Sequence, residues 1–192
     1  MATKTFLQRG ATSVEFGLVA LFFLAFCFGL IEYGRLMFIW NALPEVARRA
    51  ARTAAMTDFT DQAALQALRT AALFGSTGTL PMASNVGSGN LRIDYLWQDA
   101  AGNIATVPVM PGCPLANRIN CTRDPHGAAC IRFVRVRLCG TASGAGCPAL
   151  EYQPMTPLIP VPASLPPASV TVPAESLGFA PGQPPCPEPA LH

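Results

Sequence analysis

One long apolar stretch near the N-terminus constrains this chain more than any other feature. Residues 9–40 read RGATSVEFGLVALFFLAFCFGLIEYGRLMFIW, and no charged residue occurs in 16–31. At a helical rise of about 1.5 Å per residue, residues 16–31 cover roughly 24 Å, slightly less than a bilayer's hydrocarbon core. Continuation to Trp40 makes the helix long enough to cross, with its last turns among the outer headgroups. The stretch predicts a single transmembrane helix.

A cleaved secretory signal peptide is the competing interpretation, because it too has a basic start and an apolar middle. The apolar run is longer than a usual signal, continues into a helical pattern, and is not followed by a small-x-small cleavage site. These features favour a retained helix. Lys4 and Arg9 before it indicate a cytoplasmic N-terminus, although Arg48, Arg49 and Arg52 beyond it weaken the charge argument.

Seven cysteines divide into one within the apolar stretch and six beyond it. Cys27 is interpreted as a thiol buried in the membrane. An even number of cysteines in a Pro- and Gly-rich region with few charges predicts three disulfides in an oxidising compartment. The six cysteines are Cys113, Cys121, Cys130, Cys139, Cys147 and Cys186. Zinc is the alternative, but the chain has no CxxC pair, and only His126 and scattered acids lie nearby. We therefore expect no metal site, and a domain outside the cytoplasm.

The pairing of these cysteines is constrained by one strand. Cys130 and Cys139 flank residues 131–138, and an extended strand would separate them by about 30 Å, so they should not pair. We expect Cys139 to pair with Cys147 and Cys113 with Cys121, which leaves Cys130 for Cys186. Six cysteines allow fifteen pairings, so other connectivities stay open.

Helix signals surround the apolar stretch. Thr12 followed by Glu15 fits a capping box, which predicts a helix start near residue 12. The helical pattern continues through residues 41–56, and Pro44 predicts a kink or a short break. The segment DQAALQALRTAALFG predicts a second helix that begins at Asp61, is capped by Asp58 or Thr60 and stops at Gly75.

The pattern then changes to that of strands. Residues 91–97 alternate, with Ile93, Tyr95 and Trp97 on one face, and with 104–109 they predict a hairpin. Residues 131–138 are the strongest strand, with Val134, Val136 and Leu138 on one face. Residues 75–90 and 113–130 are predicted loops. The Pro-rich region after 148 predicts extended edge segments, with 168–172 as a strand and a frayed tail after Leu177.

These elements predict an α+β fold: a long N-terminal transmembrane helix, a second short helix, then a small antiparallel β-sheet domain with disulfides and a Pro-rich C-terminal segment. A chain of 192 residues has room for one modest domain beyond the helix. We expect a cytoplasmic leader at 1–10, the helix at 11–56, the domain at 57–177 and a flexible tail at 178–192. The net charge of +2 and dispersed arginines exclude a nucleic-acid footprint.

The N-terminal motifs carry a family resemblance. GATSVEF, the apolar helix, GLIEYGRLMF and ARRAARTAA resemble the TadE-like minor pseudopilins of tight-adherence (Flp/Tad) pilus systems, which belong with the type IV pilin-like proteins. The resemblance covers residues 9–55 and returns weakly in the PLxP-type segment 157–160. The six cysteines do not map onto the family pattern.

The resemblance implies roles for single residues. A prepilin peptidase would cut after Gly10 and leave Ala11 as the new N-terminus, and Glu15 and Phe16 match the processing motif, with Phe16 where major pilins usually carry tyrosine. A carboxylate at the bilayer edge is costly unless paired, and a neighbouring subunit's amino terminus would pair with Glu15. The capping box is its other role, and the two are compatible. Independently of the family, Glu32 and Arg35 lie three apart and can form a helix ion pair.

The implied function is a minor pseudopilin that takes part in assembly or function of a Flp/Tad-type pilus. The implied location is the bacterial inner membrane, single-pass, with the C-terminal domain in the periplasm; whether the protein also enters the extracellular pilus stays open. Prepilin peptidase, other pilin-like subunits and the assembly machinery are the implied partners, and no cofactor is expected.

The residues also bear on two other functions. An anchored periplasmic enzyme is disfavoured because His126 is the only histidine in the body of the domain, and no GxSxG, HExxH or close carboxylate pair occurs. The chain is therefore predicted not to be an enzyme. The remaining alternative is a single-pass anchored binding or adhesive domain without pilin processing, with Tyr95 and Trp97 exposed rather than in the core.

Overall fold

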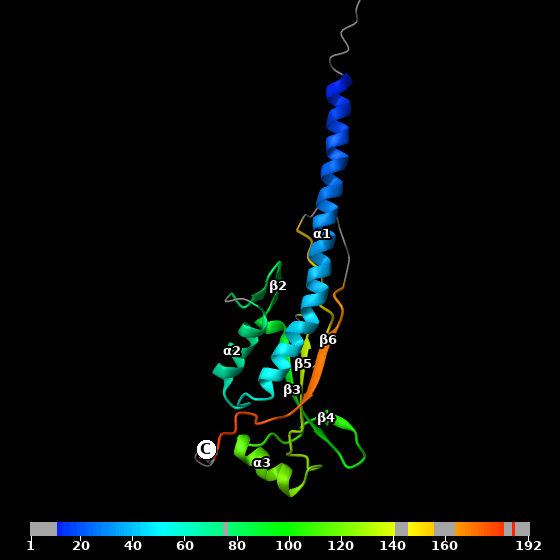
Figure 1. Ribbon diagram of the computed structural model, residues 1–192. Coiled ribbons are helices and arrows are strands. Elements are labelled where there is room, and N and C mark those ends of the chain that lie inside the picture. Colours follow the sequence, from blue (N-terminus) through cyan, green and yellow to red (C-terminus); the bar gives the residue numbers. More distant parts are fainter. Residues whose placement is uncertain (1–10, 75–76, 141–145, 156–163, 183–185, 187–192) are drawn as a thin grey trace, which may run out of the picture.

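The computed structural model describes residues 11–74, 77–140, 146–155, 164–182 and 186. Figure 1 shows one long helix that projects from a smaller domain of strands and short helices, which lies along the lower half of that helix. The α+β prediction is confirmed. Gly10, Gly75 and the segment 157–160 lie outside the described residues, so the predictions made on them stay predictions.

The long helix, α1 (Ala11–Ala54), is continuous. Thr12 lies inside it rather than at its N-cap, so the predicted capping box is wrong. The sequence predicted a kink or a short break at Pro44. The helix runs through Pro44 without a break. Leu43 and Val46, on either side of the proline, are fully buried, and packing on both sides offsets the one hydrogen bond that proline removes.

The second helix, α2 (Gln62–Ala72), is present where the sequence predicted it, but its cap differs. Asp61 itself is the N-cap, and its carboxylate accepts a hydrogen bond from the backbone N–H of Ala64 at 2.9 Å. Asp58 instead accepts from the backbone N–H of Thr60 in the preceding turn. The helix is amphipathic and buries Leu65 and Leu68.

Four antiparallel strands form the main sheet in the order β4-β3-β5-β6. Their bounds are β3 Leu91–Gln98, β4 Ile104–Thr106, β5 Phe133–Leu138 and β6 Ala168–Pro173. The predicted hairpin is confirmed, with Leu96 opposite Thr106. In the sheet centre Val136 lies opposite Ile93 on one side and Val170 on the other.

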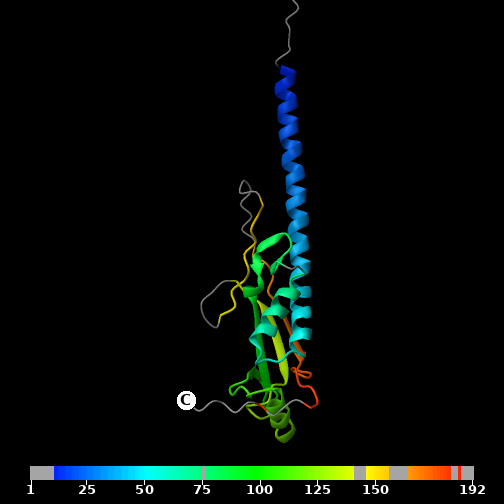
Figure 2. The same cartoon turned by 90° about the vertical axis from the view of Figure 1, so that its left-hand side faces the viewer.

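The lower half of α1 packs on one face of this sheet and completes the core. Val134 and Val136 of β5 and Val46, Ala47 and Ala50 of α1 are all fully buried in the same cluster. Because alanine is short, the helix axis can approach the strands closely. Figure 2 shows the strands running alongside this half of the helix, while the upper half stands clear of the domain.

Two predicted loops contain regular structure. Residues 79–90 form a small hairpin, β1 Thr79–Leu80 and β2 Ala83–Gly87, followed by the 3-10 turn η1 Ser88–Asn90. Residues 114–123 form helix α3, Pro114–Arg123. Its signal was Pro114, which suits the first helical position because its missing N–H would be unpaired there anyway.

Helix α3 also explains why two predicted disulfides are wrong. Cys113 and Cys121 lie at opposite parts of this helix, about 12 Å apart along its axis, and bridged Cα atoms lie within about 7 Å. Cys121 instead pairs with Cys130, which the following turn brings to a Cα separation of 4.8 Å, and Cys113 pairs with Cys186. Cys139 pairs with Cys147 as predicted, and Cys27 is free.

Candidate functional site

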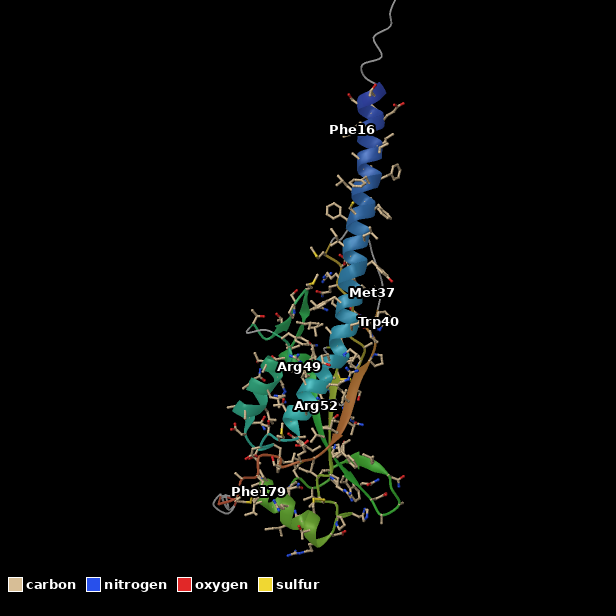
Figure 3. All side chains as sticks on the ribbon, in the orientation of Figure 1. Phe16, Met37, Trp40, Arg49, Arg52 and Phe179 are labelled. Carbon is tan, nitrogen blue, oxygen red and sulfur yellow. A yellow bond between two sulfur atoms is a disulfide. The ribbon has the colours of Figure 1, made fainter. Side chains whose placement is uncertain are left out.

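The upper half of α1 is a bare apolar rod. None of residues 12–31 is buried in the part of the chain that the structure describes, and Phe16, Phe22 and Phe26 are each more than 60% exposed. Figure 3 shows Phe16 standing out from the helix far above the domain. In the described residues, α1 is the one helix long and apolar enough to cross a membrane.

Glu15 lies near the upper end of this rod. Its side chain is exposed and has no hydrogen-bond or ion-pair partner among the described residues. Ala11 is the first described residue of α1, and Glu15 follows it by four positions, so both positions lie on the same face of the helix.

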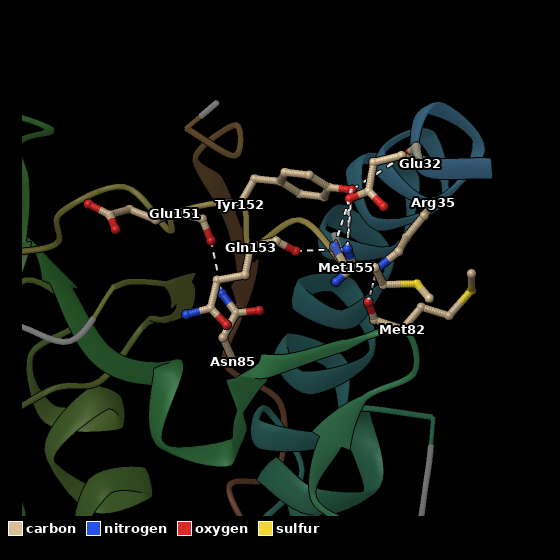
Figure 4. A network of polar contacts seen from close by, with 8 residues as sticks. All are labelled: Glu32, Arg35, Met82, Asn85, Glu151, Tyr152, Gln153 and Met155. Carbon is tan, nitrogen blue, oxygen red and sulfur yellow. Dashed lines mark hydrogen bonds and ion pairs between the residues drawn. The ribbon is translucent and has the colours of Figure 1, made fainter. Parts of the chain in front are cut away.

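The character of α1 changes at Glu32 and Arg35. Both are only 7% exposed, and they are the first buried positions on the helix. Arg35 Nη1 lies 3.0 Å from Glu32 Oε1, and the two side chains form an ion pair on one helical turn. Figure 4 shows this pair with the segments gathered around it.

Further hydrogen bonds tie two distant segments to this ion pair. Arg35 Nε donates to the carbonyl oxygen of Met82 at 2.6 Å, and Arg35 Nη1 donates to that of Gln153 at 2.7 Å. The backbone N–H of Met155 donates to Glu32 Oε1 at 3.1 Å. The turn between β1 and β2 and the segment 146–155 are therefore fastened to the same helical turn, as Figure 4 shows.

Tyr152 completes the network. Its hydroxyl donates to Glu32 Oε1 and accepts from Arg35 Nη1 at 3.3 Å, and the Arg35 guanidinium lies 5.2 Å from the ring centroid. Burial, together with the hydrogen bond to Glu32, raises the pKa of Tyr152 to about 12. The phenol is therefore protonated, and so able to donate, across the physiological pH range.

Tyr95 is a second buried tyrosine with a different environment. It is 9% exposed and its ring packs against Phe59 at a centroid distance of 5.7 Å. Burial raises its pKa to about 12 as well, yet its hydroxyl has no hydrogen-bond partner among the described residues. Trp97 is partly buried against the same core. These two residues lie in or against the core, whereas a binding or adhesive domain would have needed them exposed.

The arrangement around Glu32 positions chain segments and has no reactive group of its own. The described residues contain no cluster of three His, Cys, Asp or Glu side chains that could hold a metal ion. His126 is an exposed turn residue whose backbone N–H donates to Asp124 at 2.9 Å and whose ring Nδ1 lies 3.2 Å from the carbonyl oxygen of Gln98.

The sequence pointed to Glu32 and Arg35 but not to their partners. Tyr152 lies 120 residues from Glu32 in the chain, in a Pro-rich segment that carries no periodic pattern. Its one signal was an isolated aromatic residue among prolines. Met82 and Gln153 contribute only backbone carbonyls, which leave no trace in side-chain identity.

Comparison with known proteins finds a family match for the first part of the chain. Residues 10–52 match the family model of the TadE-like proteins. No curated protein and no solved structure matches the chain. The matched segment contains all of α1 except its last two residues, including Glu15, Glu32 and Arg35, and ends before α2. The recognised N-terminal segment is thus TadE-like, as its motifs predicted.

We predict that Glu32→Gln destabilises the domain far more than Glu45→Gln. The first substitution leaves the Arg35 guanidinium buried without its counter-charge, which costs roughly 3 to 5 kcal/mol. Glu45 also pairs with an arginine three residues later, at 3.2 Å, but that pair is exposed and screened by solvent, so its loss should cost far less. Denaturant unfolding of the full chain in detergent, followed by tryptophan fluorescence, measures both. Equal losses would contradict the role given to the buried pair.

We predict opposite outcomes for two Tyr→Phe substitutions. Tyr152→Phe removes hydrogen bonds to charged groups and should lower the unfolding free energy by about 1.5 to 3 kcal/mol, whereas Tyr95→Phe removes an unpartnered buried hydroxyl and should be neutral or stabilising. The same unfolding measurement tests this pair.

Both phenols have a folded-state pKa above the unfolded value near 10, so their ionisation leaves stability unchanged below about pH 10 and lowers it as the pH rises towards 12. Between about pH 9 and 12, the free energy of unfolding of each Phe variant should therefore fall less than that of the parent. A Tyr152→Phe protein as stable and as alkali-sensitive as the parent would rule out the hydrogen-bonded role.

Proposed function

We propose that this chain, TadE-like over residues 10–52, is a minor pseudopilin that takes part in assembly or function of a Flp/Tad-type pilus. The observation that supports this most directly is the continuity of α1. Its bare apolar half leads without a linker into a buried half that forms the core of a disulfide-bonded domain. A subunit built in this way can be held in a membrane by the helix and later packed by the same helix among other pilin-like subunits.

In this proposal α1 crosses the bacterial inner membrane once. Residues 12–31, at about 1.5 Å per residue, cover roughly 30 Å, which matches the hydrocarbon core. Three disulfides fit an oxidising compartment, so the domain lies in the periplasm and Lys4 and Arg9 lie in the cytoplasm. A prepilin peptidase cuts between Gly10 and Ala11, and Glu15 and Phe16 beyond the cut match its processing motif.

Glu15 has an assembly role in this proposal. Its exposed carboxylate, without a partner among the described residues, lies one helical turn beyond Ala11. Such a charge at the membrane edge is costly unless it is paired, and the amino terminus created on a neighbouring subunit supplies a positive partner. Gly17 and Gly29 lie on the same rod, and a Cβ atom added to either would meet nothing within 4 Å, so these positions leave room for neighbouring helices.

We predict that Glu15→Ala leaves peptidase cleavage intact but reduces incorporation with other pilin-like subunits by roughly tenfold or more, since a loss of about 1.4 kcal/mol changes an equilibrium tenfold. Glu45→Ala is the matched control, because it removes a carboxylate from the same helix in the part that lies along the domain. Cleavage is read from the mass of the membrane-bound protein, and incorporation from its share of the sheared pilus fraction.

Wild-type levels of the Glu15→Ala protein in the pilus fraction would contradict the pairing role. Absence of the unaltered protein from any complex with pilin-like subunits, together with an uncut leader, would contradict the pseudopilin function. The chain would then be a single-pass anchored binding or adhesive domain.

A further inference from the structure

The hairpin β1–β2 ends in an exposed methionine with an unfavourable backbone conformation. Pro81 and Met82 form its turn, and Met82 has a φ of 65°, a left-handed conformation that long side chains rarely adopt. Its side chain is nevertheless 54% exposed, so packing within the chain does not explain the choice of residue. Strained residues of this kind concentrate at positions whose side chains are used for binding.

A second exposed methionine lies beside the first. Met155 is 66% exposed and is held in place by the hydrogen bond from its backbone N–H to Glu32. Met82 is held through its carbonyl oxygen by Arg35. Both methionines and Arg35 line one shallow hollow, and Figure 4 shows the two thioether side chains next to each other beside the ion pair. We call Met82 and Met155 the methionine rim.

The rim lies at a defined level along α1. Glu32 and Arg35, to which it is fastened, directly follow the bare segment 12–31, whose length of roughly 30 Å matches a hydrocarbon core. Tyr33 and Trp40, 61% and 44% exposed, lie on the next turns of the helix, as aromatic residues do at membrane interfaces. Figure 1 shows that the β1–β2 hairpin lies at the end of the domain nearest the bare half of α1, where the segment 146–155 also rises alongside the helix.

We propose that the methionine rim inserts into the boundary between headgroups and acyl chains of the phospholipid leaflet on the domain's side. The partner is the bilayer itself, because the rim is fastened to Glu32 and Arg35, at the level of α1 where the apolar surface of residues 12–31 ends. The charges of Glu32 and Arg35 neutralise each other, which suits a position close to lipid. The same pair holds the two flexible apolar side chains of the rim towards the lipid. This inference depends on the membrane-spanning position of α1 proposed above.

The rim gives the domain a contact with the membrane besides the helix itself. Because α1 continues rigidly into the core, seating the rim on one side of the helix restricts the tilt of the whole subunit. Domain orientation is thereby set before any neighbour is engaged.

Depth-dependent fluorescence quenching tests the proposal on the full disulfide-bonded chain. The chain is reconstituted in phosphatidylcholine vesicles with or without lipid brominated near the glycerol end of the acyl chains. In a Trp40→Phe, Trp97→Phe background, single tryptophans are introduced by Met82→Trp and Met155→Trp. Ile104→Trp is the matched control, because Ile104 is 51% exposed on β4, at the far end of the domain in Figure 1. Phe16→Trp reports on the span itself.

We expect brominated lipid to reduce the emission of the Met82→Trp and Met155→Trp proteins by roughly twofold, as for residues buried 5–10 Å into the interface, and to leave the Ile104→Trp protein unchanged. If Phe16→Trp is quenched and neither methionine position is, the insertion of the rim is contradicted while the membrane span stands. If Phe16→Trp is not quenched, the span itself is wrong. Should Met82→Trp lose its disulfides because of the strained turn, Met155→Trp, which has no such strain, decides the question.

Discussion

The structure depends on one continuous helix, α1, whose upper half is exposed and whose lower half is buried in the domain core. Residues 12–31 of α1 carry apolar side chains into open space, and from Ile39 to Ala55 the chain carries them into the core. The change occurs over little more than two turns. Because a helix transmits its direction along its length, the packing of the sheet and α2 on its lower half sets the position of the domain relative to the bare segment.

The buried ion pair marks the boundary between those surroundings. Moving two charges out of water is expensive, and a buried pair repays that cost only when its remaining hydrogen-bonding groups are also used. Here Glu32 accepts from Tyr152 and Met155 in addition to Arg35, and Arg35 donates to Met82 and Gln153. We interpret the pair as a device for specificity: it selects which turns of the domain lie against this level of the helix, and the β1–β2 turn and the 146–155 segment meet there.

Sequence reasoning succeeded where a pattern was long or strongly periodic. The apolar helix, the amphipathic α2 and the alternating strands β3 and β5 each repeat one environment over many residues. It failed for α3, where Pro114 was the only clear signal and residues 113–130 were predicted to be a loop. A loop allows Cys113 to reach Cys121, so this error led directly to the two wrong disulfides. The partners of Glu32 and Arg35 could not have been found, because Tyr152 is remote in the chain and Met82 and Gln153 act through backbone atoms that every residue has.

The central claim is that this helix enters the membrane as a pilin-type segment, which its TadE-like sequence over residues 10–52 supports. The most direct measurement is the N-terminal mass of the mature protein from isolated membranes. The account predicts a chain that starts at Ala11. A chain that retains its start at Met1 or Ala2 would contradict pilin-type processing and leave a plain membrane anchor, and a start beyond residue 35 would contradict the anchor as well.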